Sequence, residues 1–167
     1  MNPMHEVLIE KVVVNMGVGG EPEEMKKAGQ IIQIVTGKKP IQTLCKVRAP
    51  EMGLRPGLPI GLKVTLRGTL AAEFLKKAFV AKEAKLLARN FDREGNFGFG
   101  ISEYINMPGA KYDPKLGIKG FDVLVALKKR GYRVKIRKIR PSPVGRKQRV
   151  SPEEAMNFVK GMGVEVQ

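Results

Sequence analysis

Apolar residues alternate strictly with polar ones over residues 62–67. The apolar positions are Leu62, Val64 and Leu66, and the polar positions are Lys63, Thr65 and Arg67. A period of two over this length predicts a β-strand with one buried face and one exposed face. The polar face carries two cations and a hydroxyl group, so we expect it to be left open for a partner.

A second strand is expected over residues 41–47, and it would add Gln42, Thr43 and Lys46 to the polar surface. Between the two strands, residues 48–60 contain three prolines, two glycines and two arginines. This much Pro and Gly excludes a helix or a central strand. A long loop inside a compact domain is usually functional or disordered. We therefore predict a long, stiffened, basic hairpin loop that is presented to a partner.

The remaining pattern predicts a mixture of strands and helices. Strands are expected over residues 7–15, 96–105, 121–127, 132–139 and 164–166. Helices are expected from Pro22 to a left-handed cap at Gly37, over residues 70–81 with Thr69 as the cap, and from a capping box of Ser151 and Glu154 to about residue 162. Residues 82–90 either continue the second helix or form a separate turn. The strands outnumber the helices and are mostly joined by hairpins. The expected fold class is therefore α+β, an antiparallel-rich β-sheet with helices packed on one face, in a single domain over residues 1–167.

The chain carries 31 Lys and Arg residues against 16 Asp and Glu residues, a formal net charge of +15. The surplus is densest in residues 128–149, which hold eleven basic residues and no acidic one. A polyanion would supply the counter-charge, and nucleic acid is the commonest polyanion in a cell. A membrane surface and a solvated basic face are the competing interpretations, and the charge density favours nucleic acid over both.

Two glycine-containing turns resemble nucleotide-binding loops only superficially. The turn Gly17-Val18-Gly19 lacks the third glycine of a dinucleotide-binding loop, because Pro22 stands in its place. The turn Gly37-Lys38-Lys39 lacks both the upstream glycine and the following Ser or Thr of a P-loop. Neither turn predicts a nucleotide cofactor.

The sequence offers few groups for catalysis. His5 is the only histidine, which excludes Ser-His-Asp triads and histidine-based metal sites. Asp92, Asp113 and Asp122 could hold Mg²⁺ for a nuclease, but the first two lie in turn sequences. We predict no catalytic residue, no metal site and no cofactor.

Several residues are expected to be structural. Phe97, Phe99 and Tyr104 could stack on bases, but core packing is the favoured interpretation. Cys45 is the only cysteine, so it is expected to be a small buried residue in a reducing compartment. The N-terminus lacks the basic and apolar regions of a signal peptide, and no apolar run is long enough to cross a bilayer. We expect a cytoplasmic protein with no membrane partner.

A rigid cationic sheet face suits a shaped RNA better than a regular DNA groove, because folded RNA is recognised through shape, 2′-hydroxyl groups and splayed bases. The signatures of helix-turn-helix, zinc-finger and basic-zipper proteins are missing, which weakens a DNA-binding interpretation. The side chains expected on the RNA-binding face are Asn15, Gln42, Thr43, Lys46, Lys63, Thr65 and Arg67.

Five motifs give the chain a resemblance to the L5 family of large-subunit ribosomal proteins, which bind 5S rRNA. They are I-E-K-V-V-V-N-M-G-V-G (residues 9–19), T-G-K-K-P (36–40), P-I-G-L-K-V-T-L-R-G (59–68), G-N-F-G-F-G-I-S-E (95–103) and Y-D-P (112–114). The opening N-P-M and the basic residues 130–149 are similar to the archaeal and eukaryotic branch of the family.

The resemblance implies a structural role in translation and no enzymatic activity. Family members attach 5S rRNA to the large ribosomal subunit within the central protuberance, which forms a bridge to the small subunit, and a loop contacts P-site tRNA. By position, the resemblance assigns 5S rRNA contacts to Asn15, Lys38, Lys39, Thr65 and Arg67. Strand geometry adds Gln42, Thr43, Lys46 and Lys63. The loop that contacts tRNA would use Arg48, Met52 and Arg55.

The basic residues 128–149 have no counterpart in bacterial relatives, and we expect them to contact large-subunit rRNA or neighbouring proteins of the central protuberance. Two other classes of function remain open at this point. One is a free-standing nucleic-acid binder, such as a chromatin or regulatory protein. The other is an RNA-processing enzyme that depends on a metal ion.

Overall fold

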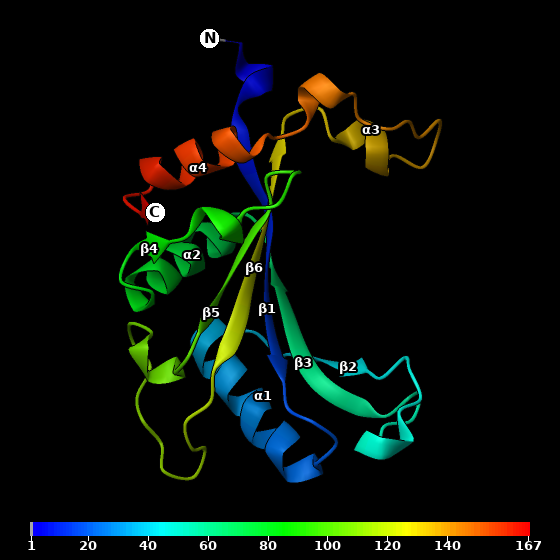
Figure 1. Cartoon of the computed structure of the whole chain (residues 1–167), viewed down its shortest axis with the longest axis vertical. Coiled ribbons are helices and arrows are strands. Elements are labelled where there is room, and N and C mark those ends of the chain that lie inside the picture. The colour runs from blue at the N-terminus through cyan, green and yellow to red at the C-terminus, as the bar shows by residue number, and fades with distance from the viewer. Residues whose placement is uncertain (1) are drawn as a thin grey trace. The chain divides into compact units, whose positions relative to one another are not determined.

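The computed structural model describes residues 2–167. Within that range, the helices are α1 (Pro22–Thr36), α2 (Thr69–Ala81), α3 (Arg133–Ile136) and α4 (Pro152–Gly161) (Figure 1). The strands are β1 (Val7–Gly17), β2 (Ile41–Leu44), β3 (Pro59–Leu66), β4 (Lys85–Leu86), β5 (Phe97–Ile101), β6 (Phe121–Lys129) and β7 (Glu165–Val166). None of the helices in this range is both long enough and apolar enough to cross a membrane.

Five strands form one sheet in the order β2-β3-β1-β6-β5, and β4 pairs with β7 in a separate parallel ladder. The expected α+β class is confirmed. The strand expected over residues 164–166 is present as β7. Its partner β4 lies in residues 82–90, which were expected either to continue the second helix or to form a separate turn.

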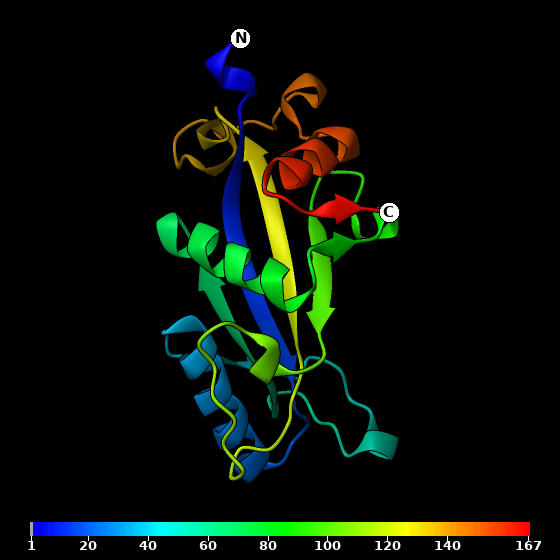
Figure 2. The ribbon, with the colours of Figure 1, turned by 90° about the vertical axis from the view of Figure 1, so that its left-hand side faces the viewer.

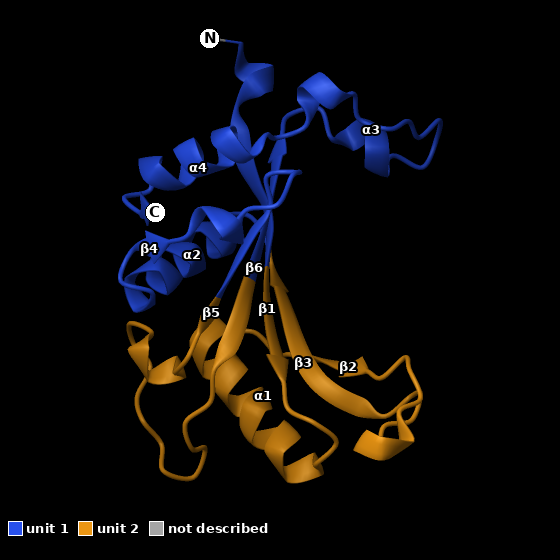
Figure 3. Ribbon diagram, in the orientation of Figure 1, with its two compact units in different colours: residues 1–12, 67–99, 124–167 blue, residues 13–66, 100–123 orange. Residues whose placement is uncertain are grey.

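The chain divides into two compact units (Figure 3). Unit 1 comprises the residues up to 12, residues 67–99 and residues 124–167, and unit 2 comprises residues 13–66 and 100–123. The strands β1, β5 and β6 cross the boundary between the units, because each contributes residues to both. The single domain expected from the sequence stays a prediction.

In unit 2, helix α1 packs on β3 and covers one side of the strands (Figure 2). Pro22 stands in its first turn, where a missing N–H costs nothing, and the C-cap residue Gly37 has a left-handed φ of 68°. The helix buries Met25, Ala28, Ile31 and Ile32. Both predicted ends of this helix are confirmed.

In unit 1, the core is built around a cluster of phenylalanine rings. The ring of Phe79 on α2 lies 6.3 Å from that of Phe97 and 5.7 Å from that of Phe99, both on β5. Phe97 and Phe99 are 3% and 6% exposed, so they are core residues, as the favoured interpretation expected. The predicted cap at Thr69 is wrong: Thr69 is already helical, and the helix is preceded by Gly68 with a φ of 63° and no capping side chain.

The C-terminal helix α4 begins with the predicted capping box. The Ser151 hydroxyl accepts from the Glu154 N–H, and the Glu154 carboxylate accepts from the Ser151 N–H at 3.0 Å. The same carboxylate lies 2.7 Å from the ammonium group of Lys129, which is only 3% exposed at the end of β6. One acidic side chain therefore both caps α4 and neutralises a buried cation.

The strand predicted over residues 132–139 is wrong. The chain leaves β6, turns at Gly131 with a φ of 90°, and forms the single helical turn α3. Ile136 and Ile139 are 71% and 79% exposed. The alternating pattern fails here because no layer of the unit covers these isoleucines, so there is no buried face for a strand to present.

Candidate nucleic-acid interface

The polar side of β3 is accessible in unit 2. Lys63 and Thr65 are exposed, whereas Leu62 and Val64 are each 4% exposed and face α1. The alternation in the sequence therefore predicted correctly which side of the strand is buried. We call the accessible side of the unit 2 strands the open face.

The register of β2 on β3 decides which β2 side chains share the open face. Thr43 lies opposite Gly61, and Ile41 lies opposite Lys63. Directly opposed residues of an antiparallel pair point to the same face. Thr43 and Ile41 therefore lie on the open face with Lys63. Ile41 is 67% exposed and was not anticipated from the sequence, although its spacing of two from Thr43 was the available signal.

Asn15 lies on the neighbouring strand β1. It alternates with Val14 and Met16, which are buried, while Asn15 itself is half-buried. Its amide is therefore directed away from the core and toward the open face. The open face includes Asn15, Ile41, Thr43, Lys63 and Thr65.

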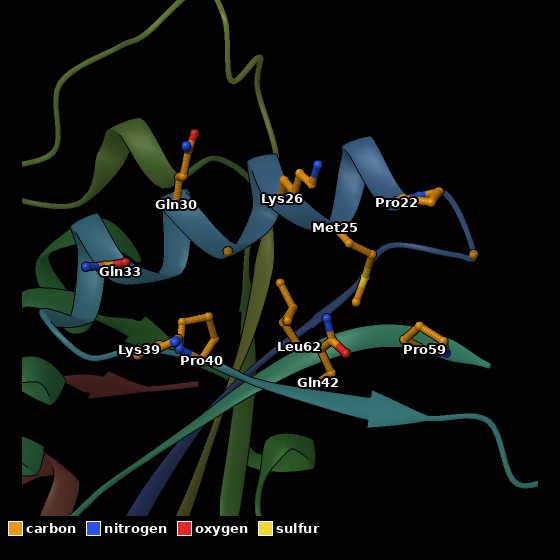
Figure 4. Close-up of a pocket in the computed structure, with 12 residues that line it drawn as sticks. Pro22, Met25, Lys26, Gln30, Gln33, Lys39, Pro40, Gln42, Pro59 and Leu62 are labelled. Carbon is orange, nitrogen blue, oxygen red and sulfur yellow. The ribbon is translucent and has the colours of Figure 1, made fainter. Parts of the chain in front are cut away.

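Gln42 lies on the other side of the sheet. It is opposite Leu62 in the ladder, so its side chain is on the α1 side. Figure 4 shows Gln42 beside Leu62, across from α1, where both line a cavity of about 510 Å³. The expectation that Gln42 and Thr43 share one surface is wrong, because adjacent residues of a strand point to opposite faces.

Three predicted lysines lie beside the sheet rather than on it. Lys38 and Lys39 are exposed directly after the Gly37 cap of α1, and Lys39 also lines the cavity that Gln42 borders. Lys46 is exposed but lies outside β2, which is shorter than predicted and ends at Leu44. Among residues 2–167, no carboxylate pairs with any of these lysines or with Lys63. Their charges are therefore available to an anion.

Glu24 in the first turn of α1 is, by contrast, paired within unit 2. The Lys119 ammonium group hydrogen-bonds to the Glu24 carboxylate, and Lys27 does so at 3.0 Å. The hydrogen bond from Lys119, and to a smaller extent that from Lys27, holds the pKa of Glu24 below its usual value. This carboxylate therefore stays ionised and paired.

Arg67 directly follows β3 and belongs to unit 1. It is exposed, as the alternation predicted, and its guanidinium donates to the backbone carbonyl of Glu10 at 3.4 Å. A carbonyl oxygen at this distance does not neutralise the charge, and among the described residues no carboxylate pairs with Arg67.

The predicted arm over residues 48–60 has internal structure. Ala49 and Leu54 exchange two backbone hydrogen bonds of 3.1 and 3.0 Å around a short 3₁₀ turn, Pro50–Met52. At its base, the Cys45 N–H donates to Leu58 at 2.8 Å, and the Cys45 side chain is buried, as expected. The arm is therefore a closed hairpin loop.

The arm presents the three predicted side chains to solvent, with Met52 in the 3₁₀ turn and Arg48 and Arg55 beside the Ala49–Leu54 pair. Arg48 and Arg55 are exposed, and Met52 is 76% exposed. Among the described residues, neither arginine is paired with an acid. The arm can therefore offer two cations and a flexible apolar side chain to one partner.

Within the part of the chain that the structure describes, no group of three or more His, Cys, Asp or Glu side chains gathers as metal ligands would. Phe97, Phe99 and Tyr104, the three aromatic side chains considered for stacking on bases, are buried, with Tyr104 at 0% exposure. What the interface offers chemically is hydrogen bonding and positive charge on a pre-formed surface.

Two family models match the chain. The model "Ribosomal protein L5" matches residues 2–55, and the model of the C-terminus of the same ribosomal protein family matches residues 59–165. The chain is 47% identical to the large ribosomal subunit protein uL5 of Methanococcus maripaludis, over 95% of this chain and 89% of that protein. It is 47% identical to the uL5 protein of Methanococcus vannielii, over 98% and 93%. It is 46% identical to the uL5 protein of Sulfurisphaera tokodaii, over 96% and 91%.

Proposed function

The chain belongs to the ribosomal protein L5 family, and from this membership we propose that it binds 5S rRNA and attaches it to the large ribosomal subunit in the central protuberance. As a member of this family it is a structural protein of the large subunit and not an enzyme. It is located in the cytoplasmic ribosome.

The observation that carries the proposal is the open face of unit 2. Lys63 and Thr65 are exposed there, on the side of β3 that α1 leaves uncovered, and Thr43 and Asn15 join them from the neighbouring strands. Lysine neutralises phosphates, while hydroxyl and amide groups hydrogen-bond to phosphate, ribose or base edges. A pre-formed surface of this kind recognises a folded RNA by its shape and loses little conformational entropy when it binds.

The remaining predicted rRNA contacts extend this surface. Lys38 and Lys39 lie at the end of α1, and Lys46 lies beyond β2, so each can reach backbone phosphates at the margin of the open face. Gln42 faces the cavity under α1 and can serve only an RNA segment that wraps around the β2 edge. Arg67 supplies a cation from unit 1.

The arm has a different role in the proposal. We assign contacts with P-site tRNA to Arg48, Met52 and Arg55, which the closed hairpin loop leaves exposed. The protuberance that the protein helps to build also takes part in a bridge to the small subunit, as in other members of the family.

A binding comparison tests this function directly. The affinity of the full chain for 5S rRNA is measured against that for duplex DNA of equal length at the same salt concentration. We expect 5S rRNA to bind at least about a hundredfold more tightly, because specific nucleic-acid complexes exceed non-specific ones by several powers of ten. Equal affinity would indicate a general nucleic-acid binder, and cleavage of the RNA with Mg²⁺ would indicate a processing enzyme.

A further inference from the structure

Residues 133–147, which we call the hook, leave the body of unit 1 after β6 and return before α4 (Figure 1). Their two ends are fastened to unit 1. The Gln148 amide donates to the carbonyls of Met4 at 2.6 Å and Arg130 at 2.9 Å. Val150 is 1% exposed, and Gly95 approaches it so closely that a Cβ at Gly95 would lie 2.6 Å from the Val150 side chain. The hook is therefore a fixed projection rather than a free tail.

The hook also holds itself together. The Ser142 N–H donates to the Val134 carbonyl at 3.2 Å, and the Arg137 guanidinium donates to the Arg140 carbonyl at 2.8 Å. Pro141 and Pro143 restrict the chain in the same region. These bonds bend the segment back on itself after the single turn of α3.

The charge of the hook is one-sided. It contains seven basic residues and no acidic one: Arg133, Lys135, Arg137, Lys138, Arg140, Arg146 and Lys147. All seven are exposed. Among residues 2–167, none of them forms an ion pair, although Arg149 and Arg130 just outside the hook pair with Glu94 and Glu6. Holding seven like charges in a compact loop is unfavourable by itself, since their repulsion is uncompensated.

Two isoleucines distinguish the hook from an ordinary solvated basic face. Ile136 and Ile139 are 71% and 79% exposed, and with Arg133, Arg137 and Lys138 they line a shallow surface depression. The exposure of large apolar side chains to water is unfavourable. They can pack against the sugar edges or unstacked bases of an RNA whose phosphates pair with the surrounding charges.

We propose that the hook is a second RNA-binding surface, which grips the backbone of large-subunit rRNA while the open face holds 5S rRNA. The identity of the RNA rests on the proposed ribosomal function, whereas the chemistry rests on the hook itself. An RNA backbone offers one anion per nucleotide along a continuous line, which matches seven cations on one loop better than the mixed charges of a protein surface. The protein thus joins two RNA molecules.

The experiment uses the full chain, first saturated with 5S rRNA and then titrated with protein-free large-subunit rRNA, both prepared from Methanococcus maripaludis. The test variant is Arg133→Gln, Lys135→Gln, Lys138→Gln, which removes three charges that form no ion pair and no side-chain hydrogen bond among residues 2–167. The control is Lys76→Gln, Lys77→Gln, Lys82→Gln, which removes three exposed charges of α2 and its C-cap from the same unit. Both variants have the same net charge.

We expect the hook variant to bind the second RNA about ten- to a hundredfold more weakly than the control, with a salt slope shallower by about 2. Its affinity for 5S rRNA stays equal to that of the control. A second variant, Ile136→Ser, Ile139→Ser, lowers affinity for the second RNA at an unchanged salt slope, because it removes packing and no charge.

Equal binding of the second RNA by the hook variant and its control would overturn the proposal. The proposal would also be overturned if the complex with 5S rRNA did not bind protein-free large-subunit rRNA and instead bound large-subunit proteins through the hook. Failure of the wild-type chain to bind 5S rRNA in the first step would contradict the proposed function instead, so the two failures are distinguishable.

Discussion

Thr43 lies directly opposite Gly61 across the β2–β3 ladder, and its hydroxyl oxygen is 2.9 Å from the place that a Cβ atom at Gly61 would occupy. The carbonyl oxygen of Met16 lies 2.8 Å from the same place. Both distances are shorter than ordinary contacts, so only glycine lets the three strands approach this closely. The backbone beneath the open face therefore depends on the absence of one side chain.

The substitution Gly61→Ala is expected to destabilise the protein by about 1–3 kcal/mol, the usual cost of forcing an extra carbon into a packed site. It should also weaken 5S rRNA binding, because β2 must shift and carry Thr43 with it. The control is Gly17→Ala, where the added carbon meets no atom within 4 Å and φ is not left-handed. Urea unfolding of both variants measures the effect, and equal midpoints would contradict the packing argument.

Removing the Arg67 guanidinium should reduce the salt dependence of 5S rRNA binding. For Arg67→Ala we expect the slope of log affinity against log salt to become shallower by about 0.7–0.9, the share of one neutralised phosphate. The long hydrogen bond to the Glu10 carbonyl is exposed, so stability should change by less than about 0.5 kcal/mol. Arg89→Ala on unit 1 is the charge-matched control. If the Arg67 variant kept the salt slope of the wild type, Arg67 would not be part of the interface.

Shortening the arm should separate the two proposed RNA contacts. Replacing residues 48–56 by a short glycine-containing turn keeps the hydrogen bonds between Cys45 and residues 57–58 that close the base of the arm. We expect unchanged affinity for 5S rRNA and weaker tRNA binding at the P site of ribosomes assembled with the variant. Because the substitution Arg48→Ala, Arg55→Ala removes charge only, comparison with it separates the effect of charge from that of length. Loss of 5S rRNA binding on shortening would contradict this division of roles.

The ion pair between Lys129 and Glu154 should make stability depend on pH. Burial raises the pKa of Glu154, but the hydrogen bonds from Lys129 and from the Ser151 N–H lower it by more, so the folded-state pKa lies below the usual 4.5. A carboxyl group with a lowered folded-state pKa contributes stability above its unfolded-state pKa and loses it as pH falls through the folded-state value. Wild type should therefore lose this contribution on acidification below about pH 4.5, and Glu154→Gln should lack that part of the pH dependence.

At neutral pH the same variant leaves Lys129 buried without its carboxylate. The side chain of Lys129 is 4% exposed but that of Glu154 is 41% exposed, so water reaches the site and the cost is about 1–3 kcal/mol rather than that of a fully buried pair. Glu6→Gln is the control, because its pair with Arg130 is half exposed on both sides and should contribute less than about 0.5 kcal/mol. Similar unfolding free energies for the two variants would contradict the structural importance of the buried lysine.

Local signals predicted the parts of the fold that local interactions determine. Pro22 and Gly37 marked α1, Ser151 and Glu154 marked the start of α4, and alternation showed which side of β3 is buried. Each of these signals acts within a few residues, so the sequence alone was sufficient.

Most errors arose where a distant partner decides the outcome. Alternation within β2 already excluded Gln42 and Thr43 from sharing one face. The register of β2 on β3 then places Gln42, and not Thr43, on the α1 side. Residues 132–139 alternate like a strand, yet unit 1 provides no layer to cover Ile136. Lys129 was included in the basic residues 128–149 that were expected to contact rRNA or neighbouring proteins, and only the position of Glu154 on α4 makes it a buried, paired cation.

The affinity of the double variant Lys63→Ala, Thr65→Ala for 5S rRNA tests the role of the open face most directly. Its control is Lys76→Ala, Thr69→Ala on α2, which removes the same two exposed residue types. We predict about a tenfold or greater loss of affinity and a salt slope shallower by about 0.7–0.9 relative to the control, at an unchanged unfolding midpoint. Equal affinity and equal slope in the two double variants would show that 5S rRNA does not lie on this surface.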